Sequence, residues 1–279
     1  MSTWYPGSMA RARRLVRENL ALVDAVVEVL DARIPWSSRD PGLDRILRGK
    51  ARLVVLNKAD LADPRRTREW LAWLEGRGER GLAFNAVQAG GTRRLLETLR
   101  SLARGRRAGR DLRLMVAGIP NVGKSSLLNR LAGRARTPTG DRPGITRGKQ
   151  WLTLASGLEL LDLPGVLAPR PPRGQAHYRL AVAGVLPEGS FDPEEVARWL
   201  LGWLDARPAG RRGLAAGYGT PAEGADALEA IGRGRGCIGP GGRVDRARAG
   251  VLILKDFREG RLGRHTLERP GGDHVAAGG

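Results

Sequence analysis

Cysteine is almost absent from the sequence, because Cys237 is the only one among 279 residues. A single thiol can form neither an internal disulfide nor a cysteine-rich zinc site, and it fits a reduced, cytosolic compartment. Long apolar runs are missing as well, since the stretch Leu20–Leu30 is interrupted by Asp24 and Glu28. The N-terminus also lacks the basic, apolar and small-residue succession of a signal peptide. These absences predict a cytoplasmic protein without a membrane segment.

Negative charge is scarce relative to positive charge. The chain has 48 Lys and Arg residues against 29 Asp and Glu, so its formal charge is +19. A surface this basic attracts polyanions, most often nucleic acid. A coding bias toward arginine is the alternative, because lysine is rare: the lysines are Lys50, Lys58, Lys124, Lys149 and Lys255. Such a bias alone does not explain why acidic residues are so outnumbered, and nucleic-acid binding is therefore favoured.

The segment Gly118–Ser125 reads G-x-x-x-x-G-K-S and directly follows the apolar run Leu112–Ala117. This pattern is typical of a phosphate-binding loop, in which glycines allow a tight turn and backbone N–H groups point at the phosphates. Lys124 is expected to reach the β- and γ-phosphates, and Ser125 to ligate Mg²⁺. A chance glycine-rich turn would not explain why strand, spacing, Lys-Ser pair and following helix occur together. The residues predicted to bind nucleotide here are Asn121, Val122, Gly123, Lys124, Ser125 and Ser126.

A second motif, Asn57–Asp60, has the pattern N-K-x-D and follows the apolar run Arg52–Leu56. A carboxylate at Asp60 can accept hydrogen bonds from both guanine N1–H and the 2-amino group, which adenine does not offer. The stem of Lys58 would pack along the base, and Asn57 completes the motif. The alternative is a polar strand-to-helix turn. A further short strand ends before Asn85 and Ala86, where the backbone of a small residue is expected to touch the base.

Two more segments fit a nucleotide site that senses the γ-phosphate. The stretch Arg134–Lys149 is rich in Gly, Pro and Arg and contains Thr146, which predicts a mobile switch. The strand Leu158–Leu161 then leads into Asp162–Gly165, with the pattern D-x-x-G. Asp162 would hold the Mg²⁺ shell and the Gly165 N–H would meet the γ-phosphate; an ordinary turn is the alternative.

All these motifs follow apolar strands in one α/β pattern, but the guanine motif precedes the phosphate loop. The sequence therefore predicts a circularly permuted P-loop GTPase domain over residues 1–186. We expect a Ras-like, mostly parallel sheet with helices on both faces, ending in a proline-rich connection and a helix.

A small all-α domain is predicted for residues 187–279. Asp192–Glu195 and Thr220–Glu223 each resemble the start of a helix, and a last helix is expected from about Asp245. Arginines surround these elements, so this domain is interpreted as RNA-binding. The tail Gly271–Gly279 is expected to be disordered.

Taken together, the motifs resemble the RbgA/YlqF family of ribosome biogenesis GTPases, which are bacterial assembly factors for the large ribosomal subunit. The resemblance covers nearly the whole chain. Besides the nucleotide motifs, it is carried by Trp4–Gly7, Asp31–Pro35, Arg142–Thr146, Arg235–Cys237 and Gly241-Gly242. Permuted GTPases of the small subunit carry zinc-binding cysteines and an added β-domain, and this sequence shows neither.

The resemblance implies a monomeric, GTP-hydrolysing assembly factor that binds the large-subunit precursor and its rRNA. It implies Thr146 as the switch threonine, with Lys124 and Gly165 as the other catalytic residues and with Ser125, Thr146 and Asp162 at Mg²⁺. Asn121 matches an asparagine associated with bound K⁺, which adds K⁺ to GTP/GDP and Mg²⁺ as a candidate cofactor.

The sequence departs from the family at the residues that would assist hydrolysis. Ser8 stands where the family has a histidine proposed to help catalysis, in a basic helix expected from about Met9. Val166 stands where Ras-like enzymes have a water-orienting glutamine, so hydrolysis needs other assistance. His177 is a possible substitute, although a surface or structural histidine is favoured. A GTP-controlled RNA-binding switch with incidental slow hydrolysis is the alternative function.

Overall fold

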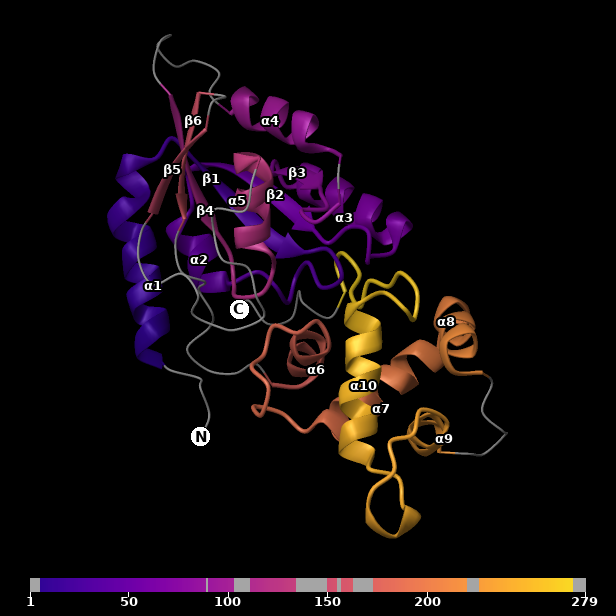
Figure 1. Cartoon of the computed structure of the whole chain (residues 1–279). Helices are drawn as coiled ribbons and strands as arrows, with labels where there is room; N and C mark the ends of the chain where they lie inside the picture. The colour runs from indigo at the N-terminus through magenta and orange to yellow at the C-terminus, as the bar shows by residue number, and fades with distance from the viewer. Residues whose placement is uncertain are drawn as a thin grey trace. The chain divides into compact units, whose positions relative to one another are not determined.

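The computed structural model describes residues 6–88, 90–102, 111–133, 150–154, 157–162, 173–219 and 226–272 (Figure 1). The chain forms two compact units. One contains the sheet and extends from Trp4 to Pro172, and it also includes the chain from Thr266 onward. The other unit is helical and comprises Arg173–His265.

Among the described residues, the sheet unit has six strands in the order β3-β2-β1-β4-β6-β5. Their bounds are β1 Ala25–Asp31, β2 Ala51–Asn57, β3 Arg80–Ala83, β4 Leu112–Ala117, β5 Gln150–Leu154 and β6 Leu158–Asp162. Only β5 is antiparallel to its neighbour; the other pairs are parallel. Every residue of β1 is buried, as expected for a parallel strand covered on both faces. The predicted mostly parallel sheet is confirmed.

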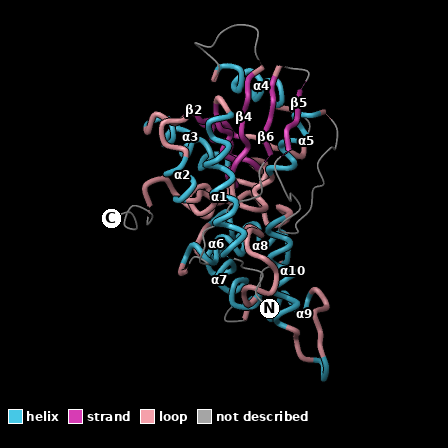
Figure 2. Tube along the Cα trace, turned by 90° about the vertical axis from the view of Figure 1, so that its left-hand side faces the viewer, coloured by secondary structure: helices cyan, strands magenta, loops and turns pink. Residues whose placement is uncertain are grey.

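Helices cover both faces of this sheet. They are α1 Pro6–Asn19, the short 3₁₀ helix η1 Leu20–Leu22, α2 Pro41–Ile46, α3 Pro64–Gly76, α4 Thr92–Ser101 and α5 Lys124–Ala132. On one face, α1 and α2 pack against Val26 and Met115, and α3 packs against Val54 and Leu56. On the other, α4 and α5 pack against each other (Figures 1 and 2). The α2 and α3 helices start with an aspartate N-cap followed by proline, which fixes where they begin.

The helical unit has five α-helices and a short 3₁₀ turn within the described residues. They are α6 Gln175–Val182, α7 Pro193–Asp205, α8 Pro208–Tyr218, α9 Ala227–Gly234, η2 Pro240–Gly242 and α10 Arg246–Arg258. Its core lies between α7 and α10, where Leu200, Leu204, Ile253 and Phe257 are buried. The two helices approach closely because Gly250 has no side chain: a Cβ there would lie 2.5 Å from the Pro193 carbonyl oxygen.

The compact units divide the chain at different places from the boundary expected at residue 186. The α6 helix groups with the helical unit, whereas the chain from Thr266 returns to the sheet unit. Helix starts also differ. The α1 helix begins at Pro6, ahead of the expected Met9, and α9 begins at Ala227, with Asp226 as its N-cap. Thr220–Glu223 lies outside the described residues. Across the described ranges, no helix combines the length and apolar character needed to span a bilayer.

Candidate functional site

The sheet brings the nucleotide motifs together at one edge. Strands β2, β1, β4 and β6 are neighbours and parallel, so their carboxyl ends lie side by side. Asp31 of β1 is paired in register with Asn57 of β2, and Val116 of β4 with Asp162 of β6. Loops that follow the carboxyl ends of parallel strands form the usual ligand site of such folds. The motifs beginning at Asn57 and Gly118 therefore meet, although they lie far apart in the sequence.

The phosphate loop leads from β4 into α5. Gly123 adopts the left-handed conformation, with φ +95°, and α5 begins at the next residue. A Cβ on residue 123 would lie 2.2 Å from Asn57 Nδ2, so only glycine allows the loop to come this close to the guanine motif. Lys124 is buried, and its Nζ donates to the Ile119 carbonyl at 2.9 Å. Its ammonium thus lies within the loop that is expected to cradle the phosphates.

Asn57 joins three parts of the predicted site. Its side-chain Nδ2 donates to the Val122 carbonyl of the phosphate loop at 2.8 Å, and its Oδ1 accepts from the Ala86 N–H at 3.1 Å. The side chain is almost fully buried. Through these two buried hydrogen bonds, Asn57 at the end of β2 connects the phosphate loop to the loop after β3.

Lys58 makes a second bridge to the phosphate loop. Its backbone has a positive φ of 58°, and its Nζ donates to the Asn121 carbonyl at 2.8 Å. Asn121 itself has φ 62°, the other positive value among non-glycine residues that the structure describes. Asp60 is half-buried, and no donor within the described ranges hydrogen-bonds its carboxylate. That carboxylate is therefore available to a ligand.

The loop after β3 contributes Asn85 and Ala86. Asn85 Oδ1 accepts from the N–H groups of Val87 and Gln88, at 2.9 and 3.1 Å, which forms a tight polar turn. Its Nδ2 is buried with no hydrogen-bond partner in the described part of the chain. Ala86 is buried beside Asn57. The loop after β3 therefore lies next to Asn57, and a contact of Asn85 and Ala86 with the base stays a prediction.

The magnesium residues are only partly within the described chain. Ser125 is half-buried in the first turn of α5, and Ser126 follows it. Asp162 ends β6, but its side chain and all of Thr146 and Gly165 lie outside what the structure describes. Across the described residues, no three His, Cys, Asp or Glu side chains cluster as a metal site. A hydroxyl and a carboxylate are hard oxygen ligands that suit Mg²⁺ when nucleotide phosphates complete its shell.

Asp31 and Arg33 also lie at this site, although the sequence pointed to them only through the family resemblance. The Asp31 carboxylate is fully buried and lies 3.2 Å from Lys58 Nζ. Burial opposes its ionisation, but the positive charges of Arg33 and Lys58 hold the pKa of Asp31 well below its usual range. The position of Asp31 at the carboxyl end of β1, beside β2, is the signal that could have placed it here.

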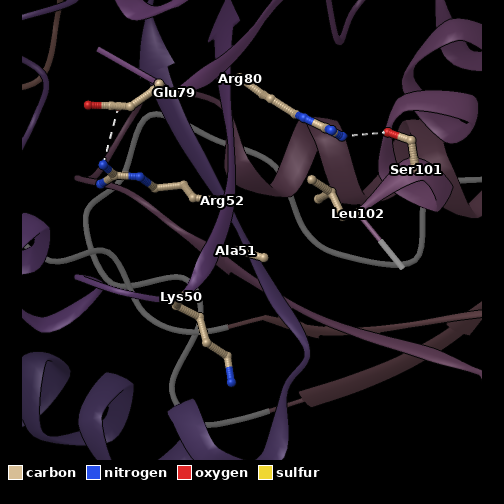
Figure 3. A pocket seen from close by; sticks show the side chains of 8 residues that line it. Lys50, Ala51, Arg52, Glu79, Arg80, Ser101 and Leu102 are labelled. Atoms are coloured by element: carbon tan, nitrogen blue, oxygen red, sulfur yellow. Dashed lines mark hydrogen bonds and ion pairs between the residues drawn. The ribbon is translucent and has the colours of Figure 1, made fainter. Parts of the chain in front are cut away.

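A separate cavity of about 420 Å³ lies at the opposite, amino-terminal edge of the sheet (Figure 3). Its lining includes Lys50, Arg52, Glu79, Arg80 and Ser101. Arg52 lies in ion pairs with Glu28 and Glu79, and Arg80 Nη1 donates to Ser101 Oγ at 3.0 Å. The charge of Arg52 is therefore compensated within the protein, and the cavity is not part of the nucleotide site.

The fold and the site define the class of this protein. A phosphate loop and an N-K-x-D motif meet at the carboxyl edge of a mostly parallel sheet, with the guanine motif earlier in the chain. This arrangement is that of a circularly permuted P-loop GTPase.

Comparisons with known proteins agree with this class. Residues 113–186 match the family model described as "50S ribosome-binding GTPase". Ribosome biogenesis GTPase A of Bacillus cereus is 39% identical, with 96% of this chain and 93% of that protein covered. The same-named protein of Bacillus pumilus is 40% identical, with coverages of 96% and 98%. The crystal structure of GNP-bound YlqF from T. maritima superposes with a TM-score of 0.66 at 27% identity, covering 94% of this chain and 99% of that one. The chain belongs to the RbgA/YlqF family of ribosome biogenesis GTPases, as its motifs indicated, and it is a GTPase.

Proposed function

We propose that this chain is an assembly factor for the large ribosomal subunit, acts in the cytoplasm as a monomer, and binds the subunit precursor through rRNA when loaded with GTP. The observation that carries the GTP-dependent part is the junction of Asn57 with Val122 and Ala86, which joins base and phosphate recognition in one site. The names of the relatives support the ribosomal part. The high positive charge supports a nucleic-acid partner.

The proposed nucleotide contacts follow from the site. Asp60 pairs with the guanine edge, Lys58 packs along the base, and Ala86 presents its backbone, with Asn85 beside it. Residues 121–126 surround the phosphates, and Lys124, Thr146 and Gly165 act on the γ-phosphate. Ser125, Thr146 and Asp162 hold Mg²⁺, which would neutralise charge that develops on the phosphate oxygens.

K⁺ is a further proposed cofactor at Asn121, which lies within the phosphate loop and has a left-handed backbone with φ 62°. Replacing K⁺ with Na⁺ should slow GTP hydrolysis, because the smaller ion would fit a K⁺ site poorly. Equal rates in the two salts would remove K⁺ from the proposal.

The helical unit offers RNA a set of exposed cations that no acidic side chain neutralises. Within the described chain they include Arg173, Arg211, Arg212, Arg243, Arg248 and Lys255. In contrast, Arg198 and Arg246 of the same unit lie in ion pairs with Glu194, Asp226 and Glu229. Uncompensated cations release condensed counterions when they contact phosphate, so we expect the first set to dominate RNA binding.

Pelleting with purified large-subunit precursors tests this proposal. With a non-hydrolysable GTP analogue, binding should be tighter than with GDP and should fall steeply with salt. The double variant Arg243→Ala/Arg248→Ala should weaken binding and reduce the logarithmic salt slope by roughly 2, since each phosphate contact contributes about 1. The ion-paired Arg198→Ala serves as the matched control and should bind nearly as the wild type does. Equal affinity in both nucleotide states, or preference for small-subunit particles, would contradict the proposal.

The second candidate function is a GTP-controlled RNA-binding switch in which slow hydrolysis is incidental. The observation that favours it is Val166, because an apolar side chain cannot orient the attacking water. The GTPase rate with and without purified large subunits separates the two functions. Strong stimulation supports an assembly factor that uses hydrolysis for release, whereas an unchanged rate supports the switch.

A further inference from the structure

The segment Asp31–Pro35 begins at the last residue of β1 and has no part in the nucleotide contacts proposed above. In the structure, Asp31 is the centre of a buried charged cluster. Its carboxylate accepts hydrogen bonds from Arg33 N–H, Nε and Nη2 at 3.0, 2.9 and 2.7 Å. Both side chains are buried. A buried charge persists only when its partners satisfy it, and Arg33 does so with a two-point geometry.

The same carboxylate also reaches the guanine motif. Asp31 Oδ2 lies 3.2 Å from Lys58 Nζ, and that ammonium in turn donates to the Asn121 carbonyl at 2.8 Å. Three loops, after β1, β2 and β4, thus meet at one lysine. Lys58 has a left-handed backbone, and its side chain reaches across this junction.

The backbone around Asp31 is itself held in place. Asp31 N–H donates to Ser38 Oγ at 3.1 Å, and Ala32 N–H donates to the Asn57 carbonyl at 2.8 Å. From the far end of the chain, Leu267 N–H donates to the Arg33 carbonyl at 2.7 Å. Because this backbone is constrained, the Asp31 carboxylate can hold the Lys58 ammonium in one position. A lysine side chain without such a partner would lose rotamer entropy on binding nucleotide.

We propose that Asp31 is a positioning residue for the nucleotide site: held by Arg33, it pre-orders Lys58 against the phosphate loop in the conformation that receives the guanine base. The proposal rests on the assignment of Lys58 to the base. Asp31 does not contact nucleotide in this proposal, and its whole effect on affinity passes through Lys58.

Titration with N-methylanthraniloyl-GDP, with nucleotide-free unfolding temperatures measured alongside, tests this in a double-mutant cycle. Lys58→Met and Asp31→Asn should each weaken GDP binding by roughly tenfold, the order expected for losing one charged contact. The double variant should be no weaker than Lys58→Met alone. Asp44→Asn, which disturbs an ion pair with Arg52 elsewhere on the unit, is the control and should leave GDP affinity unchanged. Additive losses, or wild-type affinity in Asp31→Asn, would overturn the proposal. An unchanged affinity in Lys58→Met would instead show that the base assignment has failed.

Loss of the Asp31 carboxylate leaves the buried positive charge of Arg33 with less compensation. The second variant is therefore Asp31→Asn/Arg33→Gln, which removes both buried charges. It should show the same weakened affinity. The scarcity of lysine also permits a measurement on the wild type: with ¹⁵N-labelled lysine, Lys58 is identified by its absence in Lys58→Arg. Its ammonium signal in the nucleotide-free protein should exchange more slowly with water than that of exposed Lys255. Identical exchange of the two would overturn the proposal even if every Asp31 variant failed to fold.

Discussion

At the residue scale, specificity for guanine depends on one carboxylate. Asp60 is half-buried, close in sequence to the Asn57 and Lys58 side chains that fasten the phosphate loop. Those two residues make intramolecular hydrogen bonds, whereas the Asp60 carboxylate accepts none from the described residues. Asn57 and Lys58 therefore order the site, and Asp60 is the residue expected to recognise the base.

Asp60→Asn should change the preferred nucleotide from GTP to XTP. The substitution removes an acceptor and adds a donor, which suits the 2-oxo group of xanthine and not the 2-amino group of guanine. Competition binding with GTP and XTP is the measurement, and the Lys58→Met variant is a useful comparison because it should weaken both nucleotides without exchanging them. Continued preference for GTP would show that the motif is misassigned.

At the scale of elements, β1 carries a charge in its interior. Glu28 is fully buried, and Arg39 pairs with it at 2.8 Å while also contacting Glu79. Burial disfavours the charged guanidinium, but Glu28 and Glu79 outweigh it and raise the pKa of Arg39. The charge of Glu28, which interrupts the apolar sequence of β1, is thus compensated by Arg39 of the following loop and by Arg52 of β2.

Arg39→Met should destabilise the sheet unit by about 2–4 kcal/mol, because it leaves Glu28 buried with only the more distant Arg52 to compensate it. The matched control is Arg93→Met, which breaks an exposed pair with Glu97 one helical turn away. Exposed pairs contribute about 0.5 kcal/mol or less, so the control should unfold like the wild type. Urea denaturation measures the free energy of unfolding of both variants. A similar loss of stability in both would contradict the importance of burial for the Arg39–Glu28 pair.

At the scale of the whole molecule, the end of the chain is part of the sheet unit. Glu268 accepts hydrogen bonds from the N–H groups of Trp36 and Ser37, at 2.7 and 3.1 Å, and from the Ser37 hydroxyl. Thr266 Oγ1 accepts from the Asp63 N–H at 3.2 Å. The chain that leaves the helical unit after His265 therefore fastens the loop that carries Asp31.

A truncation after His265 should destabilise the sheet unit by about 2–4 kcal/mol, since it leaves the partly buried N–H groups of Trp36 and Ser37 without their acceptor. It should also weaken GDP binding, because that loop holds Lys58 indirectly. A truncation after Gly272 keeps every contact named here and is the control. Thermal unfolding with and without GDP measures both effects. Wild-type stability in the shorter chain would show that the segment contributes little.

Parts of the fold have only weak local signals in the sequence. The short helix α2 and the glycine-containing helix α8 lack a strong apolar period, and neither was expected from the sequence. The boundary predicted at residue 186 followed the end of the nucleotide motifs, whereas the grouping of α6 with the helical unit depends on its packing against α7. Packing between helices, which no local pattern encodes, decides where such a unit begins.

The sequence by itself determined the class of this protein. Phosphate-loop and N-K-x-D patterns are local, because successive residues at one strand end provide most of each motif, and their order along the chain reveals the permutation. Only the tertiary structure decided how the motifs are joined. Asn57 bonds to Val122, and Lys58 forms an ion pair with Asp31. Glu268 accepts hydrogen bonds from Ser37 and from Trp36, which is 232 positions away in the sequence. Such contacts depend on which strands become neighbours and on which buried charges must find partners, and these are properties of the folded chain as a whole.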